Sequence, residues 1–322
     1  MEKATLHSIY EVPHRVDEED NTILISALTD MSFATYETGW AVGSGQVLLT
    51  RDGGQSWLNQ FDPQLRQFGI SPWRARAVDA NTCWLIGLLN AGDVRCCYTR
   101  DAGESWEPKK FQPKFFPNDV FFDGSKRGWI VGDDGDYHSG RGRMLFITSD
   151  AGDAWDQVDL GVVGRPERIR FLEDGRRGWL IERRLTASGE PVSRLYSSSN
   201  GGLQWEPVVH FERGVSELCL LDAQTVFVAG DDGFVSRTTD GGQTWERLNT
   251  QCRGFINSIQ FYDKRLGLLM SDFGVLLLTE NGGESWRRIS DSKKLGSLVA
   301  AVFLSETRIV VAGIRGIYSL KL

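Results

Sequence analysis

Thr238-Thr-Asp-Gly-Gly-Gln-Thr-Trp245 is one of six related eight-residue stretches, called boxes below, in this 322-residue chain. The other boxes span residues 50–57, 99–106, 148–155, 198–205 and 279–286. Subtracting consecutive positions gives spacings of 49, 49, 50, 40 and 41 residues between Trp57, Trp106, Trp155, Trp205, Trp245 and Trp286. A repeat of roughly 40 to 50 residues is typical of solenoids and propellers. The boxes therefore predict an architecture and say little about activity.

Each box has the chemistry of a tight turn between two β-strands. Its third residue is Asp52, Asp101, Asp150, Asn200, Asp240 or Asn281. Asp and Asn side chains fold back onto nearby backbone N–H groups, and glycine adopts positive φ without steric cost. The tryptophan that ends the box supplies a large ring for packing between sheets. Because asparagine replaces aspartate in two boxes, we interpret this position as a turn residue and not as a catalytic carboxylate.

The pattern Ser/Thr-x-Asp-x-Gly-x-x-Trp resembles the Asp-box, or BNR repeat, of sialidases, sortilin-type receptors, some β-glucan-cleaving enzymes and photosystem II assembly and stability factors. A second run, seen in Gly39-Trp-Ala-Val-Gly43 and Gly128-Trp-Ile-Val-Gly132, recurs ahead of the boxes. This combined rhythm looks most like the photosystem II assembly factor family and extends over nearly the whole chain. The resemblance implies seven blades and a protein-binding role.

The strand pattern predicts the same architecture. Each repeat contains an inner apolar run, the Gly-Trp run, and one strand on each side of the box, and four-stranded repeats of this length are propeller blades. Six boxes define six blades. Residues 297–322 supply three further strands, and residues 4–10 supply a lone one. Joining them completes a seventh blade without an open sheet edge, so we predict one all-β propeller domain over residues 1–322.

Composition narrows the function classes. The formal net charge of −7 argues against a nucleic-acid partner. No run of eighteen apolar residues is present, so we predict no membrane-spanning helix. The start, Met1-Glu-Lys-Ala-Thr-Leu-His7, has no basic segment followed by an apolar one. We therefore expect a cytoplasmic protein, with a trimmed exported protein as the alternative, since family members in the thylakoid lumen carry export sequences.

The chain offers no pattern for a metal or cofactor. Its five cysteines are scattered, as buried reduced residues are, and its four histidines lack metal-ligand or triad spacing. The acidic run Gly132-Asp-Asp-Gly-Asp136 has a counterpart in Gly230-Asp-Asp-Gly233 at the same place in another repeat. We interpret both as hairpin turns and predict neither a metal nor a cofactor.

Loop length and arginine content depart from strict repetition. Blades two to four are longer than blades five and six, with the extra residues at 59–72, 132–143 and 182–193. Insertions in repeat proteins often map to a binding face. Alternation in Arg168-Ile-Arg170 directs both arginines to one side of an inner strand, and Arg74-Ala-Arg76 holds the matching place. The alternative for these arginines is salt bridging across blades to carboxylates in the matching strands, Asp119 or Glu217.

We predict a non-enzymatic scaffold, adaptor or assembly factor that is monomeric on its own and binds an acidic protein or peptide. Guanidinium groups bind carboxylates bidentately and suit interfaces. The predicted partner-binding residues are Arg74, Arg76, Arg168, Arg170, Arg183, Arg184, Trp73 and Tyr137. Charge reversal at Arg168 and Arg170 is expected to abolish binding without unfolding the protein.

Two other functions stay open. A carbohydrate-active hydrolase would use a carboxylate pair in the channel mouth, although the early Phe-Arg-Ile-Pro type motif of sialidases is missing. A small-molecule binder would line a pocket with the loop aromatics Phe68, Trp73 and Tyr137.

Overall fold

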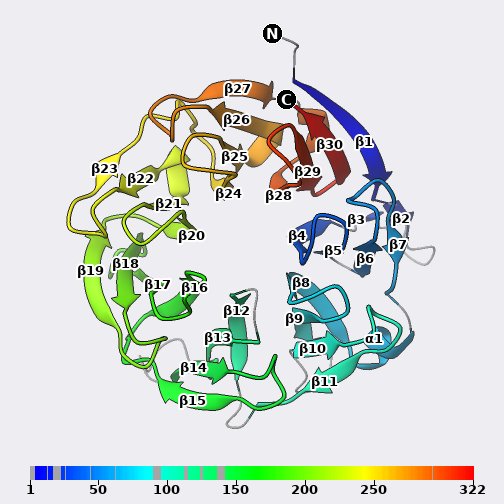
Figure 1. Ribbon diagram of the computed structural model, residues 1–322, viewed down its shortest axis with the longest axis horizontal. Coiled ribbons are helices and arrows are strands. Elements are labelled where there is room, and N and C mark those ends of the chain that lie inside the picture. The colour runs from blue at the N-terminus through cyan, green and yellow to red at the C-terminus, as the bar shows by residue number, and fades with distance from the viewer. Residues whose placement is uncertain are drawn as a thin grey trace. The chain divides into compact units, whose positions relative to one another are not determined.

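The structure is a computed structural model in which β-strands dominate. It describes residues 4–12, 14–16, 23–25, 27–43, 45–61, 63–89, 96–111, 115–123, 126–135, 142–291 and 293–322. Within these residues the strands form seven four-stranded antiparallel sheets and one two-stranded sheet (Figure 1). The predicted class, a seven-bladed β-propeller, is confirmed.

The seven sheets are called blades one to seven in chain order. Blade one contains β4 (Leu28–Phe33), β5 (Gly39–Gly43), β6 (Gln46–Thr50) and β7 (Leu58–Asn59), and blade two β8 (Ile70–Ala77), β9 (Cys83–Leu89), β10 (Cys96–Thr99) and β11 (Glu107–Lys109). Blade three contains β12 (Phe116–Phe122), β13 (Gly128–Asp133), β14 (Arg143–Thr148) and β15 (Asp156–Asp159), and blade four β16 (Arg165–Phe171), β17 (Gly178–Leu185), β18 (Pro191–Ser198) and β19 (Glu206–Phe211).

Blade five contains β20 (Val215–Leu220), β21 (Val226–Gly230), β22 (Val235–Thr238) and β23 (Glu246–Arg247), and blade six β24 (Ile256–Phe261), β25 (Gly267–Ser271), β26 (Val275–Thr279) and β27 (Arg287–Asp291). Blade seven contains β28 (Leu298–Phe303), β29 (Arg308–Gly313), β30 (Gly316–Lys321) and β1 (Thr5–Glu11). The remaining elements are β2 (His14–Val16), β3 (Ile23–Ile25), α1 (Pro63–Gln67) and the single-turn 3-10 helices η1 (Asp231–Gly233), η2 (Asp272–Gly274) and η3 (Lys293–Leu295).

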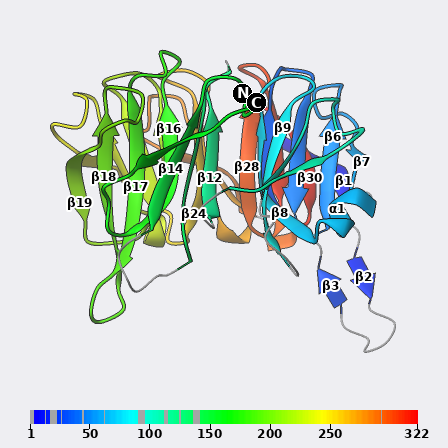
Figure 2. The same ribbon diagram turned by 90° about the horizontal axis from the view of Figure 1, so that it is seen from below.

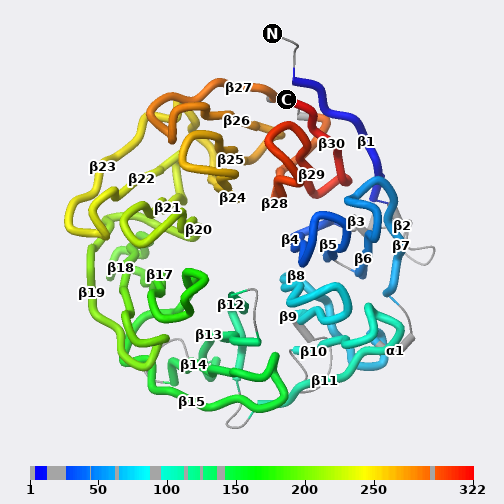
Figure 3. The backbone as a smooth tube through the Cα atoms, viewed as in Figure 1, coloured from blue at the N-terminus to red at the C-terminus, as the bar shows by residue number. Residues whose placement is uncertain are grey.

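The N-terminal strand completes the last blade, as predicted. β1 pairs antiparallel with β30, from Thr5 opposite Lys321 to Glu11 opposite Gly316 (Figure 3). This pairing satisfies the backbone groups along the outer side of β30, which would otherwise form an unpaired sheet edge.

The contacts of the backbone divide the chain into two compact units. The first consists of Met1–Lys110, Leu268–Leu278 and Arg287–Leu322, and includes blades one, two and seven. The second consists of Phe111–Gly267 and Thr279–Trp286, and includes blades three, four and five. The single domain over residues 1–322 stays a prediction.

Aromatic rings join neighbouring blades inside the second unit. Trp129 of blade three stacks on Phe171 of blade four with 3.9 Å between ring centroids and 12° between ring planes. Phe227 of blade five stacks on Phe261 with centroids 4.4 Å apart. Such pairs contribute about 0.5–1.5 kcal/mol beyond the burial of their area. In blades three and five the aromatic residue near the start of the second strand therefore packs against the next repeat.

The boxes form the predicted hydrogen-bonded turns. In blade one, Thr50 Oγ1 donates to Asp52 Oδ1 over 2.8 Å and accepts the Gly54 N–H over 2.8 Å. Asp52 Oδ1 also accepts the Ser56 N–H over 2.9 Å. Gly54 has a φ of +78°, which favours glycine at this position.

Asparagine does the same work where it replaces aspartate. Asn200 Oδ1 accepts the Gln204 N–H over 3.0 Å, and Asn281 Oδ1 accepts the Ser285 N–H over 3.0 Å. The turn therefore requires an oxygen acceptor at the third position and not a charge.

We predict that the box of blade five contributes an acid-sensitive part of the stability. Hydrogen bonds from the Thr244 side chain and backbone lower the pKa of Asp240 from its ordinary 3.8 to about 2. The ionised form is therefore favoured by folding, so its contribution is present above about pH 4 and is lost as the pH falls towards 2. Asp240→Asn keeps the acceptor and removes the titration. Urea unfolding at pH 6 and pH 3 should show a smaller loss of stability in this variant than in the parent.

Asn281→Asp is the reciprocal control, since it places a titrating carboxylate at the third position of a box that has asparagine there. Equal pH dependence in the parent and in Asp240→Asn would contradict this role for the box carboxylate.

Candidate functional site

One register position in the inner strands alternates in charge from blade to blade. It lies just after a register shift between the inner strand and the second strand of the same blade. Its partners in the second strand, for blades one to five in order, are Val42, Ile86, Val131, Ile181 and Ala229. Blades one to five carry Asp30, Arg74, Asp119, Arg168 and Glu217 there. Opposite charges at matching positions of successive repeats favour ion pairs between adjacent blades.

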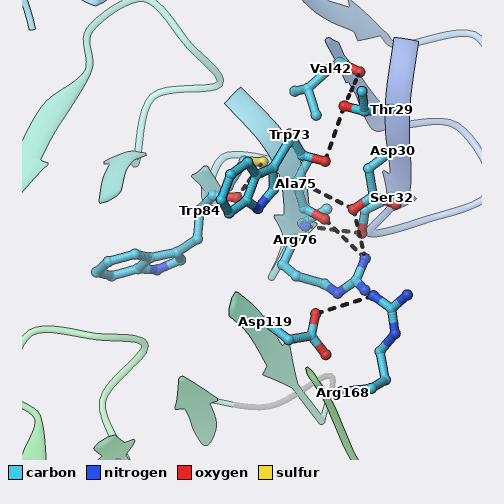
Figure 4. Close-up of polar contacts among 12 residues, drawn as sticks. Thr29, Asp30, Ser32, Val42, Trp73, Ala75, Arg76, Trp84, Asp119 and Arg168 are labelled. Atoms are coloured by element: carbon cyan, nitrogen blue, oxygen red, sulfur yellow. Dashed lines mark hydrogen bonds and ion pairs between the residues drawn. The ribbon is translucent and has the colours of Figure 1, made fainter. Parts of the chain in front are cut away.

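In the second unit these residues form a buried network. Only 3% of Arg168 is exposed, and its Nε donates to the Ser216 carbonyl over 3.0 Å. One terminal nitrogen of Arg168 lies 3.6 Å from Asp119 Oδ1, and the other contacts the Glu217 carboxylate (Figure 4 shows the Asp119 pair). Arg170 adds an ion pair of 2.5 Å to Asp119 Oδ2. The network thus joins blades three, four and five.

The first unit repeats part of this arrangement. Asp30 Oδ2 accepts the Ala75 N–H over 3.1 Å and lies 3.4 Å from Arg76 Nη1 (Figure 4). Asp119 does the same in the second unit, where it accepts the Ile169 N–H over 3.0 Å. Each inner-strand aspartate therefore binds both the backbone and an arginine of the following blade.

The alternative held open for these arginines is thus realised in the structure: Arg76, Arg168 and Arg170 form salt bridges across blades. Arg74 and Trp73 are half-buried, and the Trp73 carbonyl accepts a hydrogen bond of 3.0 Å from Thr29 Oγ1. The buried position of Arg168 leaves little of its guanidinium for a partner. Partner binding by this set remains a prediction.

Arg183 and Arg184 lie at the end of the longest hairpin among the described residues. β17 and β18 each contain eight residues, and their turn extends beyond the strands of blade four in Figure 2. Arg165, which sequence reasoning did not select, is the register partner of Arg183. Its side chain is 40% exposed, close to the 31% and 37% of Arg183 and Arg184. These three arginines therefore lie at one end of blade four, although their side chains point in different directions: Arg165 contacts Asn118 of blade three, and Arg183 lies 3.9 Å from Asp231, which follows blade five's β21.

A glycine exchange explains how this end of blade four is built. In the inner strand, the register position just before the shift faces one residue of the second strand. That residue is glycine in five blades, namely Gly43, Gly87, Gly132, Gly230 and Gly313, and it is Glu182 in blade four. A Cβ at Gly87 would meet Ile70, and one at Gly132 would meet Phe115 and the Phe116 carbonyl. Blade four reverses the sizes: Gly164 is small, and a Cβ there would meet Glu182. The break in the glycine column is the sequence signal that could have identified Glu182.

Glu182 is fully buried and organises the arginine beside it. Its Oε1 lies 2.5 Å from Arg184 Nε and also accepts the Gly164 N–H, and its Oε2 accepts the Tyr196 hydroxyl over 2.6 Å. Burial, followed by the hydrogen bond to Glu182, raises the pKa of Tyr196. The hydrogen bond to Glu182 raises the pKa of Arg184. A carboxylate below the surface thus fixes a guanidinium at the surface.

Two exposed apolar side chains border these arginines. Val163 precedes Gly164, and Leu185 follows Arg184 at the end of β17. We call Val163, Arg165, Arg183, Arg184 and Leu185 the blade-four arginine surface. Paired cations with an apolar border can bind an acidic segment that also carries apolar groups.

The other predicted site residues are placed differently. Phe68 is half-buried and packs against the core cluster that contains Trp40 and Leu85. Tyr137 lies outside the described residues. Within the described parts of the chain, no three His, Cys, Asp or Glu side chains are grouped to hold a metal ion. No described helix is both long and apolar enough to cross a membrane.

The five cysteines are free thiols, and all but Cys219 are buried. Burial raises the pKa of Cys96 and of Cys219 to about 12 in each case. Thiols held in the neutral form are poor nucleophiles and metal ligands, so these two residues fit a structural role.

Seven four-stranded blades with six boxes define the class of an Asp-box β-propeller. Within that class the chain resembles the photosystem II assembly factors. Residues 200–307 match the family model described as photosynthesis system II assembly factor YCF48.

Three curated relatives carry related names. The photosystem II assembly lipoprotein Ycf48 of Synechococcus sp. (strain CC9902) is 26% identical over 55% of this chain, a match that spans only half of that protein. The photosystem II assembly protein Ycf48 of Thermosynechococcus vestitus is 25% identical, with 69% of this chain and 72% of that protein covered. The chloroplastic photosystem II stability/assembly factor HCF136 of Arabidopsis thaliana is 24% identical, with 77% and 74% covered.

Solved structures share the fold. YCF48 bound to a D1 peptide has a TM-score of 0.68 at 19% identity, covering 100% of this chain and 96% of that one. YCF48 from Cyanidioschyzon merolae has a TM-score of 0.66 at 19% identity, covering 97% of each chain. The GH74 xyloglucanase from Xanthomonas campestris has a TM-score of 0.70 at 14% identity, covering 98% of this chain and 53% of the enzyme.

These comparisons bear on two predictions. The expected cytoplasmic location is wrong, because one relative is a lipoprotein and another is chloroplastic. The first residues of the chain were therefore a poor guide to location. The expectation of a non-enzymatic protein is supported, since the relatives are assembly factors, although a glycosidase shares the fold.

We predict that Arg168 is required for stability. Arg168→Leu should lower the free energy of unfolding by about 3 kcal/mol, because it leaves buried carboxylates without their partner. Arg168→Leu with Glu217→Leu should recover part of this loss, and Arg51→Leu is the exposed control. The measurement is urea unfolding of all four proteins. This prediction replaces the expectation that charge reversal at Arg168 and Arg170 leaves the fold intact. A loss of stability below about 1 kcal/mol in Arg168→Leu would contradict it and favour the earlier expectation.

We also predict that Gly164 and Glu182 are coupled. Gly164→Ala should lower the free energy of unfolding by about 1–3 kcal/mol, because the added methyl group overlaps Glu182 and the Arg183 carbonyl. Gly164→Ala with Glu182→Gly should be more stable than the sum of the two single changes, since it restores the order of sizes found in blades two and three. Additive effects in this double-mutant cycle would contradict the coupling.

Proposed function

We propose that this protein is a non-enzymatic assembly or adaptor factor that binds an acidic protein segment through the blade-four arginine surface. The relatives are photosystem II assembly and stability factors, and a solved structure of one of them contains a D1 peptide. A peptide partner for this chain agrees with both. The main support for this proposal is the Arg184 side chain, which is 37% exposed and is held in place by an ion pair with the buried Glu182.

The geometry favours a carboxylate-bearing ligand. Arg184 uses Nε to contact Glu182, and Arg165 uses Nη2 to donate to Asn118 Oδ1 over 2.6 Å. Side chains that are already ordered lose less conformational entropy on binding. Guanidinium groups bind carboxylates through parallel hydrogen bonds. Each of the three arginines also lies within 4.0 Å of a carboxylate: Arg184 of Glu182, Arg165 of Asp133 and Glu167, and Arg183 of Asp231. A ligand carboxylate would bind the donors that these pairs leave exposed.

The other predicted anchors would have a supporting role in this proposal. Arg76, Arg168 and Arg170 are paired with Asp30, Asp119 or Glu217 between blades. Within each unit they would hold an inner strand against the inner strand of the neighbouring blade. The proposal thus moves the contact with the partner from the inner strands to the blade-four arginine surface.

A hydrolase is less well supported. Asp119, Asp133 and Glu182 are fully buried, and each accepts hydrogen bonds from neighbouring groups. A glycosidase needs two carboxyl groups that reach the substrate on either side of the bond to be cleaved. We further propose that the protein acts as a monomer, because β1 already covers the outer side of β30.

The test is binding of a fluorescent D1 peptide, measured by anisotropy at low and high salt. The parent should bind more weakly at high salt, because exposed charges are screened. Arg165→Ser with Arg183→Ser and Arg184→Ser should weaken binding about tenfold or more, corresponding to at least 1.4 kcal/mol. The matched control changes three other exposed arginines, Arg51, Arg66 and Arg247, to serine.

The outcomes separate the function from its location. Absence of binding by the parent would contradict the proposed function. Equal loss of affinity in the test and control variants would reject the blade-four arginine surface and leave only a general effect of charge.

A further inference from the structure

We propose a second docking site, for a polypeptide segment that presents an aromatic or long aliphatic side chain next to a carboxylate. It is a groove between blades three and four, named the Leu203 groove after its most exposed apolar residue. The groove does not depend on the blade-four arginine surface. The two lie at opposite ends of blade four, because Leu203 is in the β18–β19 turn and Arg176 in the β16–β17 turn, whereas Arg184 is at the β17–β18 turn. Alternate turns of an antiparallel sheet lie at opposite ends.

The groove is held open by hydrogen bonds between the two blades. It has a volume of about 500 Å³, with Arg127, Trp129 and Ile147 from blade three, and Gly175, Arg176 and Leu203 from blade four, among its lining residues. Trp129 Nε1 donates to the Gly201 carbonyl over 2.8 Å. Arg127 Nη1 donates to the Asp174 carbonyl over 2.8 Å. Both walls are therefore fixed before any partner binds.

Leu203 is an exception within the repeat. It is 60% exposed. The same position in the other boxes is polar: Gln55, Glu104, Asp153, Gln243 and Glu284. A single exposed leucine is normal in soluble proteins, so the inference needs the surrounding residues as well.

The neighbouring groove in the same unit provides an internal comparison. It lies between blades four and five, and has a volume of about 390 Å³. Its repeat-equivalent residues are Ser197 in place of Ile147, Gln224 in place of Arg176, and Gln243 in place of Leu203. Each groove has one arginine from its first blade, Arg127 or Arg177. The groove between blades three and four adds Arg176 and the apolar Ile147 and Leu203, where the next groove has polar uncharged residues.

Charge and depth identify the occupant. Arg176 is exposed, and its N–H and that of Arg177 donate to Asp174 Oδ1, which fixes the turn and occupies that carboxylate. Glu173 is the other acidic residue of the turn; its backbone carbonyl accepts from Arg127, and its side chain is exposed. A cation beside an apolar wall complements an apolar side chain next to an acidic one. Small-molecule sites bury most of their ligand, whereas the exposure of Leu203 shows a shallow wall, which suits one side chain of a longer segment.

The probe for this site is the blocked peptide acetyl-Gly-(4-fluoro-Phe)-Asp-Gly-amide, titrated with the intact protein and followed by its fluorine signal. Binding should saturate, and the Ile147 methyl signal of the protein should shift with it. The same peptide with Lys in place of Asp should bind about tenfold more weakly, since the carboxylate and its pairing with Arg176 are lost.

Variants exchange the residues of the two grooves. Ile147→Ser with Arg176→Gln and Leu203→Gln should abolish saturable binding. The reverse exchange on this background, Ser197→Ile with Gln224→Arg and Gln243→Leu, should restore it at the neighbouring groove. All six positions are in turns or at strand ends, and thermal unfolding checks that each variant folds. Arg165→Ser with Arg183→Ser and Arg184→Ser should leave binding of this probe unchanged, which separates the two proposals.

Four results would overturn the inference: no saturable binding, equal affinity for the Asp and Lys peptides, unchanged binding after the first exchange, or equally tight binding of free N-acetyl-4-fluorophenylalanine. The last result would assign the groove to a small molecule instead of a polypeptide segment.

Discussion

The structure depends on the pairing of inner-strand carboxylates with the blade that follows. Asp30 and Asp119 make the same contacts in the two units. Each accepts a backbone N–H of the next inner strand. Each also pairs with an arginine of that strand, two residues beyond the position that matches the aspartate. A carboxylate buried in this way is costly unless it is fully hydrogen-bonded and paired. The same contacts therefore specify the register between neighbouring blades, because a shift of one residue would leave a buried charge without its partner.

Both binding sites that we propose lie where blade four departs from the repeat. The repeat places glycine in the second strand, where Gly87 and Gly132 make room for Ile70 and Phe115. Blade four exchanges the sizes, and the resulting Glu182 holds an exposed arginine in place. Leu203 departs from the repeat in the opposite sense, with an apolar side chain at a polar position of the box. Both departures are in blade four, and both concern exposed side chains, Arg184 and Leu203.

The fold could be predicted from the sequence to an unusual extent. Box spacing and the Gly-Trp run predict the blades, and the unmatched runs at residues 4–10 and 297–322 predict the pairing of β1 with β30. Local chemistry is sufficient for these features: a turn needs glycine and an acceptor side chain within a few residues. The candidate site was less predictable. Alternation correctly placed Arg168 and Arg170 in an inner strand, but it could not show whether they face a partner or a carboxylate of the next blade.

The sequence by itself thus determined the number of blades, the turns and the closing strand, because each of these follows from residues that are close in the chain or repeat at a regular interval. Only the tertiary structure decided which arginines are available. Arg168 and Arg184 are alike as residues, but one lies between Asp119 and Glu217 while the other is exposed above Glu182. Whether an arginine is exposed or paired depends on residues that are far apart in the chain, such as Asp119 and Arg168. The packing of one blade against the next decides which of these side chains meet.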